Sequence, residues 1–216
     1  MKRILFIGTL MLVAAGMLFL PVSATAMEYQ KTGTVVYTQS VVDLRNTMRQ
    51  LWEDHIVYTR SFITSALAGL DDTGKVAERL LRNQDDIGNA IKPIYGDEAG
   101  KKLSALLRDH ILIAADIVAA AKAGDNDGVA KGQKRWTANA DDIAVFLSSA
   151  NPNWPVQKLK DMLYMHLAFT TTEVVSRLKK DWSADIEAYD KGHVHMLMFA
   201  DMLTDGIVKQ FPAKFK

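Results

Sequence analysis

The chain has 216 residues and no cysteine, and its 26 Lys and Arg residues nearly balance its 25 Asp and Glu residues. A sequence without cysteine excludes disulfides, thiol nucleophiles and cysteine-based metal sites. The formal net charge of +1 gives no electrostatic case for binding nucleic acid or an anionic membrane surface. No nucleic-acid partner is therefore expected, and the fold must depend on an apolar core.

The N-terminus has the pattern of a secretory signal peptide (residues 1–26). Lys2 and Arg3 form a basic start, an apolar run follows, and the small residues Ala-Thr-Ala at 24–26 form a cleavage signal. The sequence thus predicts a mature chain that begins at Met27 and is secreted or periplasmic. An uncleaved N-terminal anchor is the alternative. No later apolar run approaches the ~20 residues that span a bilayer, so no stable membrane insertion is expected after cleavage.

The remaining chain divides into a short arm and a long helical region. Residues 27–40 are polar, include Gly33 and lack a helical stripe, which predicts a flexible N-terminal arm. Over 41–212, apolar residues recur at steps of three and four, and strand signals are absent. We predict an all-α domain of three tandem antiparallel hairpins, forming a six-helix bundle or a short helical array. The helices are separated by turn or loop sequences at 71–74, 95–96, 124–128, 151–155 and about 180–183.

One phrase occurs three times in this region, with a histidine at its fifth position. It reads LWEDHIVYTR, LLRDHILIAA and, more weakly, MLYMHLAFTT. The histidines are His55, His110 and His166, which lie 55 and 56 residues apart. A fixed period of this length indicates a repeated supersecondary unit.

A second phrase falls on the other helix of each predicted hairpin. The pattern Asn-x-Asp-Asp-Ile occurs at 83–87 and 139–143, and HVHML occupies the corresponding place at 193–197. A helix rises about 1.5 Å per residue, which puts each histidine level with the polar group of its partner helix. If the hairpins pack in register, these groups form one buried layer. Its predicted members are His55, Asn83, Asp86, His110, Asn139, Asp142, His166 and His193.

The first explanation of this layer is a transition-metal site, since the core of a helical bundle is a usual place for one. Imidazole and carboxylate ligands suit zinc, copper, iron or manganese. Asp190 and His193 have the spacing of the Glu-x-x-His motif in carboxylate-bridged metal bundles. His195 lies off the apolar stripe and is a weaker candidate. The predicted ligands are His55, His110, His166, His193, Asp86 and Asp142, with Asn83, Asn139, Asp190 and Glu173 around them.

The second explanation is a hydrogen-bonded network that only fixes helix register. The protein would then be a non-enzymatic structural or interaction module with a protein partner of unknown identity. Two further interpretations stay open: a pH-sensitive switch built on buried imidazoles, and a metalloenzyme with carboxylate and histidine ligands. The sequence contains no Gly-rich phosphate loop and no Gly-x-Ser-x-Gly motif, so we assign no catalytic residue.

Five phrases carry a resemblance to an uncharacterised family of bacterial helical proteins: LWEDHIVYTR, LLRNQDDIGNAIKPIYG, NADDIA, MLYMHL and ADMLTDGI. The resemblance covers roughly 41–212 and implies an all-helical fold. Members of this family are often labelled automatically as glycosyltransferase or acetylglutamate kinase. A kinase needs a phosphate cradle, and a sugar-nucleotide transferase usually has an α/β nucleotide-binding fold. The residues of this chain support neither activity, so the resemblance supplies no mechanism.

Overall fold

Six long helices account for most of residues 37–216, the part of the chain that the computed structural model describes. The predicted signal peptide and most of the predicted arm lie outside the described residues. The first helix begins at Gln39, two residues before its predicted start. The elements are α1 (Gln39–Ala68), α2 (Thr73–Tyr95), α3 (Asp97–Ala123), α4 (Asn126–Ala150), α5 (Val156–Leu178), α6 (Trp182–Gln210) and a final 3-10 turn, η1 (Pro212–Phe215).

The helix ends lie where the turn sequences predicted them. Gly69 and Gly124 end α1 and α3 in the left-handed conformation, with φ of 71° and 73°, which glycine adopts without a steric penalty. Asp125 and Asp181 cap α4 and α6, and the side chain of each accepts a backbone N–H from the first turn. Pro93 lies within α2, which continues to its end two residues later.

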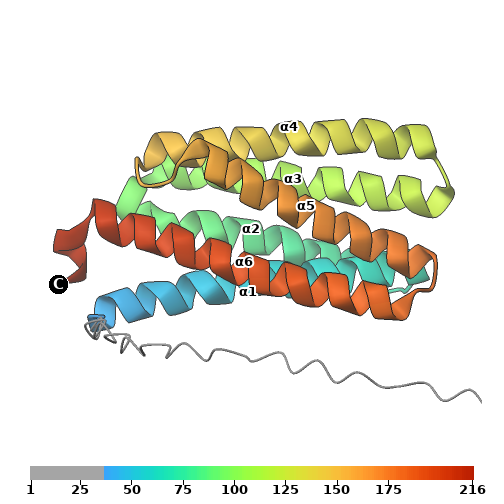
Figure 1. The fold of residues 1–216 in the computed structure, drawn as a ribbon, viewed down its shortest axis with the longest axis horizontal. Coiled ribbons are helices and arrows are strands. Elements are labelled where there is room, and N and C mark those ends of the chain that lie inside the picture. The colour runs from blue at the N-terminus through green and yellow to red at the C-terminus, as the bar shows by residue number, and fades with distance from the viewer. Residues whose placement is uncertain (1–36) are drawn as a thin grey trace, which may run out of the picture. The chain divides into compact units, whose positions relative to one another are not determined.

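Consecutive helices run in opposite directions, as the colour gradient in Figure 1 shows. Each helix packs against the next one along the chain, and α1 also packs against α6, which closes the bundle. The prediction of an all-α bundle is confirmed. The grouping into three separate hairpins is not, because α2 packs against α3 as extensively as against α1. No helix in the described part of the chain is long and apolar enough to cross a membrane.

The backbones of α2 and α3 approach each other closely at Gly88 and Gly100. A Cβ atom at position 88 would lie 2.5 Å from the carbonyl oxygen of Gly100, and one at position 100 would lie 2.6 Å from that of Gly88. Such distances leave no room for a side chain, so glycine at both positions sets the spacing of α2 and α3. This contact follows directly after the Asn83–Ile87 phrase and holds its helix close to the core.

Candidate functional site

Three histidines meet in the centre of the bundle. His55, His110 and His166 come from α1, α3 and α5, and their side chains are only 2–3% exposed. The Nε2 atoms of His55 and His166 face each other at 3.5 Å. The ring centroid of His166 is 5.4 Å from that of His55 and 6.1 Å from that of His110. The repeated phrase thus brings its three histidines together, and we call them the histidine cluster.

Aromatic rings form part of the wall around this cluster. The Trp52 ring meets His55 edge-on at 5.7 Å, and the Trp136 ring lies 5.1 Å from His110. Phe199 of α6 packs edge-on against Trp52 at 5.0 Å. These large side chains are themselves buried, so the imidazoles lie in an apolar environment with little access to water.

This environment keeps the histidine cluster neutral. Burial lowers the pKa of His55 to about 3, helped by the charge that His110 would carry and opposed by the Gln84 side chain. Burial also lowers the pKa of His110 to about 4, against a smaller opposing effect of Asn139. The pKa of His166 lies well below its ordinary value, again chiefly because of burial. Charges on His55, His110 and His195 would each lower it further.

A hydrogen bond from the neighbouring helix reaches the backbone one turn before each cluster histidine, and its geometry repeats. Asn83 donates to the carbonyl oxygen of Leu51, and Asn139 donates to that of Leu106, both at 3.0 Å. In each case the acceptor lies four residues before the cluster histidine. His195 makes the same contact in α5–α6, since its Nε2 donates to Met162, four residues before His166, at 2.8 Å. The structure therefore gives His195 the place that the sequence interpretation assigned to His193.

Asn139 also fixes the protonation of His110. Its Nδ2 donates to a carbonyl, so its Oδ1 is the acceptor that lies 2.7 Å from Nδ1 of His110. Nδ1 of His110 must then carry the proton, which leaves its Nε2 with a free lone pair. Of the three imidazoles, His110 is thus the one whose tautomer is set by a hydrogen bond within the described chain.

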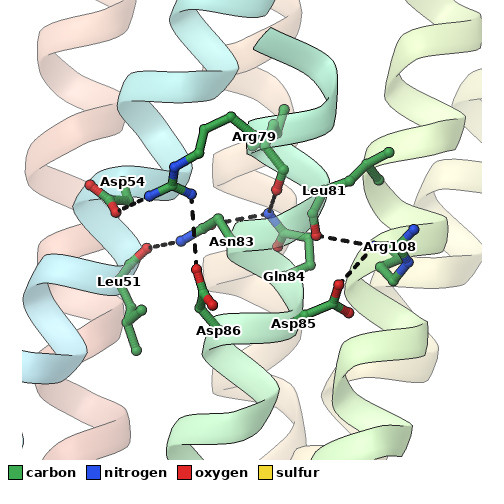
Figure 2. A network of polar contacts seen from close by, with 10 residues as sticks. Leu51, Asp54, Arg79, Leu81, Asn83, Gln84, Asp85, Asp86 and Arg108 are labelled. Atoms are coloured by element: carbon green, nitrogen blue, oxygen red, sulfur yellow. Dashed lines mark hydrogen bonds and ion pairs between the residues drawn. The ribbon is translucent and has the colours of Figure 1, made fainter. Parts of the chain in front are cut away.

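The Asn83–Asp86 segment behaves differently on its two faces, as Figure 2 shows. Asn83 and Gln84 point inward and are fully buried, and Gln84 Nε2 donates to Asn83 Oδ1 at 3.1 Å. Asp85 pairs with Arg108 of α3 at 3.0 Å. Asp86 is partly exposed and lies 4.0 Å from Arg79 Nη1. The amides therefore belong to the core, whereas Asp85 pairs with a cation of α3 and Asp86 lies near a cation of its own helix.

Besides Nε2 of His110, two fully buried imidazole nitrogens of the cluster have no hydrogen-bond partner within the described chain. They are the Nδ1 atoms of His55 and His166, and the Oε1 atom of Gln84 is likewise buried without a partner. Gln84 lies near enough to His55 to affect its pKa, although the two side chains do not meet in hydrogen-bond geometry. Sequence reasoning missed Gln84, because the second phrase has Ala140 in the same place and the repeat gave no signal.

The predicted carboxylates do not join the cluster. Asp142 and Asp190 are exposed, and Asp86 lies in the ion pair described above. His193 is partly exposed, and its Nε2 lies 3.3 Å from Glu53 Oε1 at the surface. A carboxylate that enters an apolar core without a cation loses its hydration, which explains why these acidic residues stay outside it.

Glu173 lies instead in a separate buried group of charges between α1, α5 and α6. Arg60 Nη1 lies 2.9 Å from Glu173 Oε1, and Arg60 also pairs with Asp185. Arg177 donates to the other side of Asp185 at 2.8 Å. Burial raises the pKa of Glu173, and the positive charge of Arg60 opposes that shift. Two cations and two anions neutralise each other there, and no cluster histidine takes part.

As the side chains stand, no group of three or more His, Asp or Glu residues within 37–216 is arranged to hold a metal ion. His55 and His166 face each other through nitrogen atoms, and His110 lies beside them. Comparisons with family models, curated proteins and solved structures return no match to this chain. The chemistry of the histidine cluster is therefore the best guide to function.

Proposed function

We propose that this protein binds a transition-metal ion in its core, through Nε2 of His55 and Nε2 of His166, with His110 as the third ligand. The observation that carries the proposal is the 3.5 Å distance between the two Nε2 atoms. Zinc–nitrogen bonds of about 2.0–2.1 Å with tetrahedral angles put two bound nitrogens about 3.3–3.4 Å apart. The pair therefore already has nearly the spacing of two ligands on one ion.

The same distance is a poor fit to a direct hydrogen bond. An N–H donor usually lies about 2.7–3.2 Å from its acceptor, and interactions beyond that range are weak. His55 and His166 are also buried and lack a partner at Nδ1, so the contact between them gives little compensation for their burial. An ion between the two Nε2 atoms would supply that compensation.

His110 needs only a modest displacement to join them. Three imidazoles on a tetrahedral ion have ring centroids about 5 Å apart, given zinc–nitrogen bonds of about 2.0–2.1 Å. The His110 and His166 centroids are 6.1 Å apart, so the His110 ring has to approach by roughly 1 Å. Asn139 holds Nδ1 of His110, as a hydrogen-bonding partner usually does for a metal-bound histidine, and leaves Nε2 available.

The ligand set indicates which ions to test first. A neutral imidazole is the form that binds metal, and burial keeps all three histidines neutral at pH 7. With no carboxylate or thiolate in the cluster, the donors are all nitrogen, which favours zinc or copper over manganese. Because the cluster is closed to solvent, we expect the ion to enter as the chain folds.

The test is elemental analysis of untagged protein, refolded with zinc or copper and then dialysed. Wild type should retain about one equivalent per chain, and His55→Ala and His166→Ala should lose it. His193→Ala is the matched control, because it removes a surface histidine and should keep the ion. Circular dichroism verifies that each variant folds, and the visible spectrum of cobalt-loaded wild type gives a readout that needs no variant.

A structural role is the second candidate, and one observation favours it. Asn83, Asn139 and His195 each join two helices through the same carbonyl contact, which fixes the register of the bundle without any ion. Wild type that refolds without metal, and whose melting temperature does not change on adding zinc or copper, would establish this role and contradict the metal proposal.

A further inference from the structure

A pocket lies beside the histidine cluster, on the side toward the α1–α2 and α3–α4 turns. Its empty volume is about 570 Å³, including space that is open to solvent, and residues of α1, α2, α3, α4 and α5 line it. Thr59, Ala114 and Thr170 are part of its wall. Each of them follows a cluster histidine by four residues, so the pocket begins one helical turn from the cluster.

The wall of this pocket is almost entirely apolar. Aliphatic side chains from α3 and α5, such as Ile117, Val118 and Val174, form its body. None of the residues that line it carries a charge. A carboxylate or an ammonium group would have to enter without a counter-ion and without its hydration, which is strongly unfavourable. The pocket therefore selects against charged ligands.

Some of the lining residues carry polar atoms, yet almost none of the surface that faces the pocket is polar. The hydroxyl oxygen of Thr59 and the indole nitrogen of Trp136 are buried without a partner in the described chain, so neither is open to the pocket. At the α4–α5 side, Gln133 Nε2 donates to Thr171 Oγ1 at 3.1 Å. Mostly apolar walls are typical of sites for small ligands.

We propose that this pocket binds a neutral aliphatic molecule of medium chain length. Its chain lies along Ile117, Val118 and Val174, and the wall holds it by apolar contact. This site needs no metal ion, so it stands independently of the proposal for the histidine cluster.

Binding can be measured with N-phenyl-1-naphthylamine, a neutral probe that fluoresces in apolar surroundings, and by its displacement with 1-decanol. We expect 1-decanol to displace the probe at a concentration at least ten-fold below that of sodium decanoate at pH 8. Thr59→Val keeps the shape of the side chain and removes its hydroxyl, which is not open to the pocket, so the affinity for 1-decanol should change by less than about two-fold. Decanoate as effective as 1-decanol would overturn the assignment of a neutral ligand.

Matched variants test whether the probe occupies this pocket. Ala114→Leu fills its inner end, and Val175→Phe fills it at a half-exposed position that tolerates a larger side chain without disturbing the core. Both should reduce probe affinity at least ten-fold. Ala119→Leu makes the same change as the first variant on the exposed side of α3 and should leave affinity unchanged. Equal probe affinity in Val175→Phe and wild type, or no saturable binding to wild type, would overturn the proposal.

Discussion

The first two repeat units, α1–α2 and α3–α4, differ from the third, α5–α6, in the residue that supports the cluster histidine. Asn83 and Asn139 use an amide for the contact, whereas His195 uses an imidazole. The acceptor carbonyl has the same place in all three units, so the geometry repeats where the residue type does not. The third unit thereby places a fourth histidine near His166, where its charge would lower the pKa of that residue.

The largest effect that we expect is that acid lowers the free energy of unfolding, because all three repeat units contain a buried neutral histidine. Unfolded histidines have a pKa near 6.5, whereas burial lowers the pKa of His55 to about 3 and that of His110 to about 4. The unfolded chain then binds more protons below about pH 6.5, so stability is complete above that pH and falls as the pH decreases. Each cluster histidine contributes a slope of about 1.4 kcal/mol per pH unit, or about 4 for all three near pH 5.

Urea denaturation of chelator-treated protein between pH 4 and 8 measures this slope. His166→Leu removes the histidine of the third unit and should reduce the slope by about one third. A stability that stays constant from pH 7 to pH 5 would contradict the burial of neutral imidazoles.

The sequence predicted the features of this fold that depend on local periodicity. Apolar steps of three and four identified the helices, and glycine and proline placed the turns near the observed ends of the helices. The repeated phrase also identified the three histidines that meet in the core. These predictions held because helix formation and the burial of an apolar stripe depend on residues close together in the sequence.

The inward face of α6 could not be predicted in the same way. Ile186, Tyr189 and His193 follow one another at steps of three and four, which predicts an inward stripe, yet the structure buries Asp185 and exposes Ile186. Asp185 is buried because Arg60 and Arg177 neutralise it from two other helices. Arg60 lies 125 positions before Asp185 in the sequence, so the apolar pattern of α6 gave no sign of this ion pair. His195, and not His193, contacts α5, whereas His193 lies beside Glu53 of α1.

Replacing the asparagine that bonds the neighbouring helix should destabilise the α3–α4 unit more than the α1–α2 unit. Asn139→Ala leaves Nδ1–H of His110 buried without an acceptor and loses the bond to Leu106, which together cost about 2–4 kcal/mol of stability. Asn83→Ala loses the bond to Leu51 and an acceptor for Gln84, at a cost of about 1–2 kcal/mol. Urea denaturation of both variants at pH 7 measures the difference. Equal losses of stability in the two variants would show that the hydrogen bond between Asn139 and His110 adds little to the free energy of unfolding.

Replacing His195 by asparagine should make the third unit resemble the second. His195 and Asn139 both lie 29 residues after their cluster histidines, so an asparagine amide at 195 is placed to reach the carbonyl of Met162. His195→Asn should therefore change the free energy of unfolding by less than about 1 kcal/mol, whereas His195→Ala should lose about 1–2 kcal/mol. If both variants lose the same amount, the contact depends on the imidazole ring, and the third unit is a departure from the repeat.

The smallest effect is expected at His193. Replacing it tests whether His193 and His195, the two histidines of α6, have different roles. His193 and Glu53 are partly exposed, and exposed ion pairs contribute about 0–1 kcal/mol. His193→Ala should therefore change the free energy of unfolding by less than about 0.5 kcal/mol at pH 7. Urea denaturation of the variant and of wild type at pH 7 measures this. A large loss would mean that His193 supports the core and that the two histidines share the role now given to His195.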